Sequence, residues 1–162
     1  MEIWLLKHQL IKAGAVHLVI PGNFPIGCIP VYLTAFQSND SATYDENRCL
    51  KQFNEFAMLH NSYIQEAIEE LREEFSFVRI AYADYYNALL KIITHAEENG
   101  FEKNGTMKAC CGSGGDYNFN VMKMCGAPGV TACSNPQSHI NWDGIHMTQA
   151  AHERMVDFFL GI

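Results

Sequence analysis

The sequence predicts an α/β fold in one domain. Its 162 residues are 48% hydrophobic and 18% charged, a composition typical of a packed globular core. Two short apolar runs, residues 15–20 and 77–83, end at the turn-forming residues Pro21 and Asp84 and are typical of strands. Segments with helical periodicity alternate with these runs, as in a parallel sheet covered by helices. We therefore expect residues 1–162 to form a single domain, or the later part of one.

Helical periodicity predicts four helices. Each has apolar residues at three- and four-residue steps, and they span residues 2–13, 46–74, 85–98 and 148–160. Gly14 is suited to end the first helix, and Asp84 and Thr148 are suited to cap the N-termini of the last two. In the second helix we place Phe56 and Tyr63 on the inner face, and we interpret the acidic outer face as solvated charge.

The first strand is expected to lie at the centre of the sheet. Residues 15–20 are apolar almost throughout, which is typical of a parallel strand buried on both faces. Residues 28–44 and 106–138 lack periodicity and are expected to be loops. A loop as long as the second one is usually functional or cross-linked.

Charge and hydropathy exclude several kinds of partner. The chain has 11 Lys and Arg against 18 Asp and Glu, a formal net charge of −7, so it lacks the basic stripe that nucleic acids or anionic membrane surfaces attract. No apolar run approaches the ~18 residues that a membrane-spanning helix needs. No Cys and His spacing fits a zinc site, and we expect neither a metal nor another cofactor.

Six cysteines in loop-like segments favour three disulfide bonds and an oxidising compartment. Adjacent cysteines rarely pair with each other, so Cys110 and Cys111 are expected to have different partners. The expected bonds are Cys28–Cys49 and two that join Cys110 and Cys111 to Cys125 and Cys133, in an order that the sequence leaves open.

Two Asn-x-Ser/Thr sequons, at Asn39 and Asn104, also favour a secreted glycoprotein. The N-terminus lacks the pattern of a signal peptide, because Lys7 and His8 interrupt the apolar run that begins at Ile3. We therefore expect that a segment upstream of this sequence is missing from it.

The most informative segment for chemistry is residues 141–148, Asn-Trp-Asp-Gly-Ile-His-Met-Thr. It places a carboxylate, Asp143, three residues before an imidazole, His146, in a glycine-containing turn that opens a helix. A hydrolase base needs an imidazole whose Nδ1–H is held by a carboxylate, which leaves Nε2 free to accept a proton. Asp143 and His146 are therefore the candidate catalytic residues.

Three further motifs make this assignment more specific. They are Pro-Gly-Asn-Phe-Pro-Ile-Gly-Cys-Ile-Pro at 21–30, Tyr-Ala-Asp-Tyr-Tyr-Asn at 82–87 and Ala-Cys-Cys-Gly-Ser-Gly-Gly at 109–115. Together with Trp-Asp-Gly-Ile-His-Met-Thr at 142–148, and in this order, they resemble the plant GDSL esterase/lipase family of SGNH hydrolases. The first and third motifs are most similar to the branch of the acetylajmalan and sinapine esterases.

The resemblance implies a secreted plant ester hydrolase with a three-layer α/β/α flavodoxin-like fold, of which residues 1–162 form an incomplete, C-terminal part. It implies that Asp143 and His146 are the acid and base of a Ser-His-Asp triad that acts on a small-molecule ester. The family carries its nucleophilic Ser and oxyanion donors in blocks near the N-terminus, and this chain contains no such blocks. Ser113 is not expected to replace the nucleophile, because the sequence predicts no strand before it.

Three hypotheses about the chain stay open at this point. It is the C-terminal part of an esterase, a truncated product that acts as a binding or decoy domain, or half of an enzyme that another chain completes. In all three cases we expect an unpaired sheet edge to promote self-association.

Overall fold

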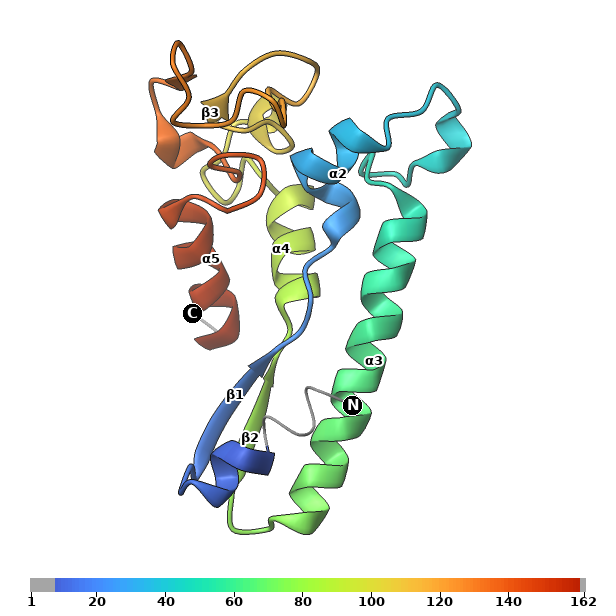
Figure 1. Ribbon diagram of the computed structural model, residues 1–162, viewed down its shortest axis with the longest axis vertical. Coiled ribbons are helices and arrows are strands. Elements are labelled where there is room, and N and C mark those ends of the chain that lie inside the picture. Colours follow the sequence, from blue (N-terminus) through green and yellow to red (C-terminus); the bar gives the residue numbers. More distant parts are fainter. Residues whose placement is uncertain (1–7, 161–162) are drawn as a thin grey trace.

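The computed structural model describes residues 8–160 and has the expected α/β fold (Figure 1). Residues 8–12 are helical, while residues 2–7 of the helix expected at 2–13 lie outside the described residues. The strands are β1 (His17–Pro21), β2 (Arg79–Ala83), β3 (Cys111–Gly112) and β4 (Thr131–Ala132), and the longer helices are α2 (Pro30–Ala35), α3 (Lys51–Glu74), α4 (Tyr85–Thr94) and α5 (Gln149–Leu160).

The main sheet consists of β1 and β2, which pair in parallel with Leu18 opposite Ile80 and Ile20 opposite Tyr82. Parallel neighbours need a crossover connection, and here the chain crosses through α2 and α3. The inner face of α3 covers one face of the sheet (Figure 1). The buried residues of this core are Ile11, Ile20, Ile64, Ile68, Leu71, Val78 and Ile80.

The expectation that the first strand is buried on both faces is wrong. Ile20 is the one buried residue of β1, and Val19 is 72% exposed. Successive side chains of a strand point to opposite faces, so the face that carries Leu18 and Ile20 packs against α3 and the face that carries Val19 does not. An apolar run alone does not reveal whether a second layer covers it.

The inner face of α3 also differs from the expected one. Phe56 and Tyr63 are 59% and 62% exposed, whereas Asn54 and Asn61 are buried. These two amides are buried because they bind the loop after β1: Asn54 Oδ1 accepts the Gly27 N–H at 2.9 Å. Asn61 accepts one N–H of that loop at 2.6 Å and donates to one of its carbonyls at 3.0 Å.

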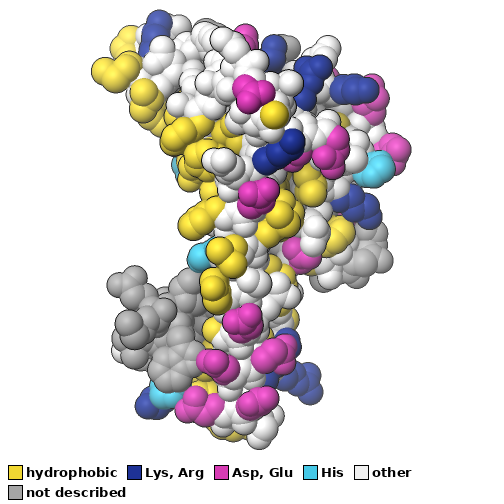
Figure 2. Space-filling model, turned by 90° about the vertical axis from the view of Figure 1, so that its right-hand side faces the viewer, with side chains coloured by type: hydrophobic (Ala, Val, Ile, Leu, Met, Phe, Trp, Pro, Cys, Tyr) yellow, Lys and Arg dark blue, Asp and Glu magenta, His cyan; other side chains and the backbone are white. Residues whose placement is uncertain are grey.

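The outer face of α3 carries exposed hydrophobic side chains along its middle and acidic side chains toward its lower end (Figure 2). The acidic residues lie on the solvent side as expected, including Glu66, Glu69, Glu70 and Glu73. The hydrophobic ones include Phe56, Leu59 and Tyr63.

A second core lies between α4 and α5. It contains the Cys28–Cys49 disulfide, Phe101 and Ile140, together with the inner residues of both helices. The two helices begin at the expected caps, because Asp84 accepts the Asn87 N–H and the Thr148 hydroxyl accepts the Ala151 N–H.

Several elements differ from the expected ones. The strands β1 and β2 begin at His17 and Arg79 rather than at 15 and 77, and β3 and β4 lie within residues 106–138, which were expected to be a loop. Helix α2 lies inside the segment expected to be a loop, because Pro30 starts a helix too short to show periodicity. Helix α3 begins at Lys51 rather than 46, since the Asp45 carboxylate holds a turn by accepting the N–H groups of residues 47 and 49. Helix α4 ends at Thr94 rather than 98, and a series of turns leads to Gly100, whose φ of +86° suits a helix stop.

The long loop of residues 106–138 is cross-linked, as expected. All six cysteines are paired, and the order that the sequence left open is Cys110–Cys133 and Cys111–Cys125. The expected Cys28–Cys49 bond is also present. No helix among the described residues is long and apolar enough to cross a membrane.

Candidate active site

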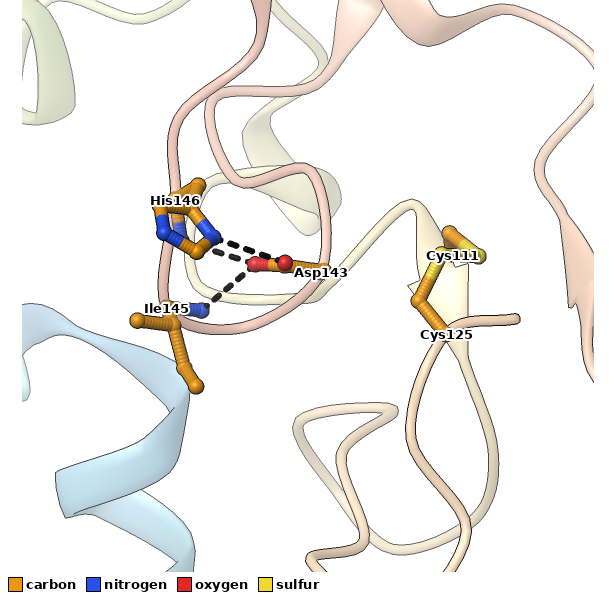
Figure 3. Close-up of polar contacts among 5 residues, drawn as sticks. All are labelled: Cys111, Cys125, Asp143, Ile145 and His146. Atoms are coloured by element: carbon orange, nitrogen blue, oxygen red, sulfur yellow. Dashed lines mark hydrogen bonds and ion pairs between the residues drawn. A yellow bond between two sulfur atoms is a disulfide. The ribbon is translucent and has the colours of Figure 1, made fainter. Parts of the chain in front are cut away.

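Asp143 and His146 lie in one tight turn, where they contact each other directly (Figure 3). The Oδ2 atom of Asp143 is 2.8 Å from Nδ1 of His146. The other carboxylate oxygen accepts the backbone N–H groups of Ile145 at 2.9 Å and His146 at 2.7 Å. One carboxylate therefore folds the turn with one oxygen and orients the imidazole with the other.

Gly144 makes this turn possible. Its φ is +92°, a conformation that other residues adopt only with strain. A Cβ at this position would lie 2.3 Å from a ring carbon of Phe119, so the site has no room for a side chain. Two hydrogen bonds fix the turn on either side: Trp142 N–H donates to the His146 carbonyl at 2.8 Å, and Val31 N–H donates to the Gly144 carbonyl at 3.0 Å.

The Asp143 carboxyl is held in its ionised form. Burial alone would raise its pKa, but the hydrogen bonds from His146 and from the Ile145 N–H outweigh burial and hold the pKa below its ordinary value of 3.8. An ionised carboxylate only accepts hydrogen bonds, so the contact at 2.8 Å requires that Nδ1 of His146 carries a hydrogen.

The free nitrogen of His146 faces solvent. The imidazole side chain is 73% exposed, against 17% for Asp143. Among residues 8–160 no hydrogen bond to Nε2 of His146 is formed, so its lone pair is open to a reacting group. A neutral imidazole held at Nδ1 and open at Nε2 is the arrangement of a general base.

Neither serine near this segment is hydrogen-bonded to His146. The expectation that no strand precedes Ser113 is wrong, because the two-residue strand β3 (Cys111–Gly112) ends just before it. The Ser113 hydroxyl donates to the Lys123 carbonyl at 2.9 Å, within the loop closed by Cys111–Cys125. Ser138 is buried, and its hydroxyl lies 2.8 Å from the Glu102 carboxylate. Both hydroxyls thus have partners other than the imidazole of His146.

Sequence reasoning does not reveal two features of the structure, of which only the first lies at the site. Phe119 is 5% exposed and lies beneath Gly144, but a single Phe in an aperiodic loop carries no sequence signal. The second feature is a polar hollow of about 1010 Å³, lined by residues from the segments 46–48, 93–98, 103–108 and 115–117. Neither Asp143 nor His146 lines it, so we do not assign it to the catalytic chemistry. The described residues contain no cluster of His, Cys, Asp and Glu that could hold a metal ion.

The chain matches proteins of one family over almost its whole length. Residues 4–159 match the family of GDSL-like lipases and acylhydrolases. A GDSL esterase/lipase of Arabidopsis thaliana is 49% identical over 150 residues, which cover 93% of this chain and 46% of that protein.

Two relatives with named activities match as well. The sinapine esterase of Brassica napus is 44% identical over 91% of this chain and 38% of its own length. Acetylajmalan esterase 2 of Rauvolfia serpentina is 40% identical over 94% of this chain and 41% of its own length. These matches confirm the resemblance drawn from the motifs, and the chain spans less than half the length of each of the three relatives. The chain belongs to the family of GDSL-like lipases and acylhydrolases.

Proposed function

We propose that this chain serves a carboxylic ester hydrolase in which His146 is the general base and Asp143 orients it. The observation that carries the proposal is the 2.8 Å contact between Asp143 Oδ2 and His146 Nδ1, with Nε2 open to solvent. The serine nucleophile and the oxyanion donors then come from residues outside these 162. The relatives, several of which are named esterases, support this assignment.

The chemistry follows from the protonation states. His146 Nε2 accepts the proton of the serine hydroxyl as its oxygen attacks the ester carbonyl, and the Asp143 carboxylate stabilises the imidazolium that forms. The imidazolium then protonates the departing alcohol, which leaves an acyl-enzyme. A water molecule, deprotonated in turn by His146, attacks the acyl carbonyl, and the imidazolium returns the proton to the departing serine oxygen as the acid is released. No step requires a metal or an organic cofactor.

The two rival hypotheses differ in what the chain does alone. A binding or decoy domain needs no nucleophile, and a half-enzyme gains one from a partner chain. We expect the purified, oxidised 162-residue chain to hydrolyse p-nitrophenyl acetate no faster than its His146→Ala variant and to resist labelling by a fluorophosphonate serine probe. Rapid turnover that His146→Ala abolishes would show that the chain contains its own nucleophile.

We also propose that the chain alone self-associates through its sheet. The two strands β1 and β2 leave both sheet edges unpaired among the described residues, and Val19 is 72% exposed. Val19→Lys places a charge on this strand without touching the core and is expected to shift the sedimentation of the chain toward a monomer. The matched control is Met122→Lys, which adds the same charge at an 88% exposed site in the disulfide-linked loop. A wild-type chain that sediments as a monodisperse monomer contradicts the proposal.

The three disulfides and the exposed sequons support a secreted glycoprotein, which we propose as its location. Asn39 and Asn104 both lie at exposed positions where a glycan is accommodated without a clash with the core. Peptide mapping of the native protein is expected to find N-acetylglucosamine on these asparagines, and unmodified peptides at both sites contradict it.

A further inference from the structure

The orientation of His146 is not fixed by burial. Its side chain is 73% exposed, and the contact that holds its ring is the one with Asp143. Asp143 in turn depends on the backbone of the turn, because its other oxygen accepts two N–H groups of that same turn. The position of the turn backbone therefore decides whether the carboxylate and the imidazole meet.

The ring of Phe119 packs directly against the backbone of this turn at Gly144. Phe119 is 5% exposed, and its ring atoms lie 2.3 to 3.1 Å from the place where a Cβ of Gly144 would be. The glycine thus rests directly against the ring. A side chain of this size in this place prevents the turn from moving toward the interior.

The segment that carries Phe119 follows a strand that is hydrogen-bonded to the chain just before the turn, and a disulfide closes this segment. The Cys111–Cys125 disulfide closes the loop around Phe119 and lies beside the turn (Figure 3). Cys110 N–H donates to the Asn141 carbonyl at 2.9 Å, and Cys111 N–H donates to the Trp142 carbonyl at 2.6 Å. The two acceptors, Asn141 and Trp142, are the residues that immediately precede Asp143.

A further contact limits the freedom of the Phe119 segment. The backbone carbonyl of Asn118 would be 1.8 Å from a Cβ on Gly112, and the Asn118 side chain donates to the Ala109 carbonyl at 2.8 Å. The residue before Phe119 is therefore packed against the strand that holds the turn. The backbone next to Phe119 is therefore held against this strand.

We propose that Phe119 is a positioning residue for the Asp143–His146 pair. The inference rests on the proposed function, because it assigns the ring a role in the same site. The Phe119 side chain has no polar atom and does not act on the substrate. Its ring fixes the position of the Gly144 backbone, and this position sets the distance between Asp143 Oδ2 and His146 Nδ1. Truncating the ring leaves a cavity into which the turn relaxes, and this movement breaks the 2.8 Å contact.

The tautomer of His146 reports this contact without any need for activity. In the wild-type chain, with ¹⁵N-labelled histidine and at a pH where the ring is neutral, we expect the Nδ1–H form that Asp143 holds. In Phe119→Ala we expect the Nε2–H form, which unconstrained histidine side chains prefer, to predominate. Phe119→Leu keeps part of the ring's volume and is expected to give an intermediate tautomer ratio. If the alanine variant does not fold, Phe119→Leu alone provides the test.

The control is Leu71→Ala, which truncates a fully buried side chain in the other core, beneath the sheet. It is expected to lower the melting temperature while His146 stays in the Nδ1–H form. In the native esterase, Phe119→Ala is expected to lower kcat by roughly 10²-fold with KM unchanged, as for a misplaced catalytic group.

Each outcome decides the question. If Phe119→Ala and Phe119→Leu keep the Nδ1–H form, the ring does not position the pair and the inference is wrong, while the proposed function stands. If Leu71→Ala shifts the tautomer as far as Phe119→Ala does, the effect is general destabilisation and the inference is again wrong. If His146 is in the Nε2–H form in the wild-type chain, Asp143 does not orient it. The proposed function is then wrong, whatever the Phe119 variants show.

Discussion

Replacing His146 with alanine is expected to lower the ester hydrolysis rate of the native enzyme about 10⁴-fold or more. In the proposed mechanism, loss of the imidazole leaves no group to accept the serine proton, and the attacking oxygen stays a poorly nucleophilic hydroxyl. The measurement is kcat and KM with p-nitrophenyl acetate, and the loss is expected in kcat. The matched control is His152→Ala, which removes an exposed histidine from α5 and is expected to leave the rate unchanged.

Asp143→Asn tests the partner of the base separately. The amide oxygen still accepts the N–H groups of Ile145 and His146, so the turn is expected to persist. The amide NH₂, however, donates toward Nδ1 and favours the tautomer with hydrogen on Nε2, which cannot act as the base. We expect a loss of about 10⁴-fold in kcat. An Asp143→Asn enzyme with nearly full activity would show that this carboxylate is not part of the mechanism.

The lowered pKa of Asp143 also fixes the direction of a pH effect. Because hydrogen bonds lower the pKa of the folded state, the ionised carboxylate adds stability above its unfolded value of 3.8, and this contribution is lost as the pH falls through the lower, folded pKa. Asp143 therefore remains ionised throughout the neutral and mildly acidic range.

Removing the disulfides of the long loop is expected to have the largest effect on stability. Cys110–Cys133 and Cys111–Cys125 close segments with sequence separations of 23 and 14 residues, and a loop of this size is worth about 3 kcal/mol of unfolding free energy in the chain-entropy description. The loop depends on these bonds because its only strands are β3 and β4, of two residues each, among the described residues.

The measurement is urea unfolding of the double variants Cys110→Ala/Cys133→Ala and Cys111→Ala/Cys125→Ala. Each is expected to lose about 3 kcal/mol. Both bonds enclose Phe119, but the second closes the smaller loop around it, so we expect the second variant to shift the His146 tautomer further than the first. A third variant, Cys28→Ala/Cys49→Ala, removes the bond that closes a loop of similar size near the other end of the chain, and it is expected to lose a similar amount of stability. Equal stability of the wild-type protein and the first two variants contradicts this account.

Local patterns explain what could be predicted from the sequence. The strands β1 and β2, the helices α3, α4 and α5 and two N-caps follow from apolar periodicity and capping residues, which act over a few neighbours. The Asp143–His146 pair was found for the same reason, since both residues belong to one turn of four residues. The cysteine partners of the long loop could not be ordered, because Cys110 and Cys111 are adjacent and either could reach Cys125 or Cys133.

The errors come from contacts between distant segments. Apolar periodicity assigns Phe56 and Tyr63 to the inner face of α3, yet both are exposed. Asn54 and Asn61 are buried on that face instead, where they bind the loop after β1. Val19 is exposed because no described helix covers its face of the sheet, and the sequence of a strand does not reveal which layers cover it. Phe119 and Gly144 meet across 25 residues, and no periodicity joins them.

The central claim is that His146 serves a serine that lies outside these 162 residues. The most direct test is to label the native protein with a fluorophosphonate probe and to identify the modified peptide by mass spectrometry, for the wild type and for His146→Ala. We predict one labelled serine in a peptide that this sequence does not contain, and no labelling in His146→Ala. A labelled serine within the 162 residues, or labelling that survives the loss of His146, would contradict the account.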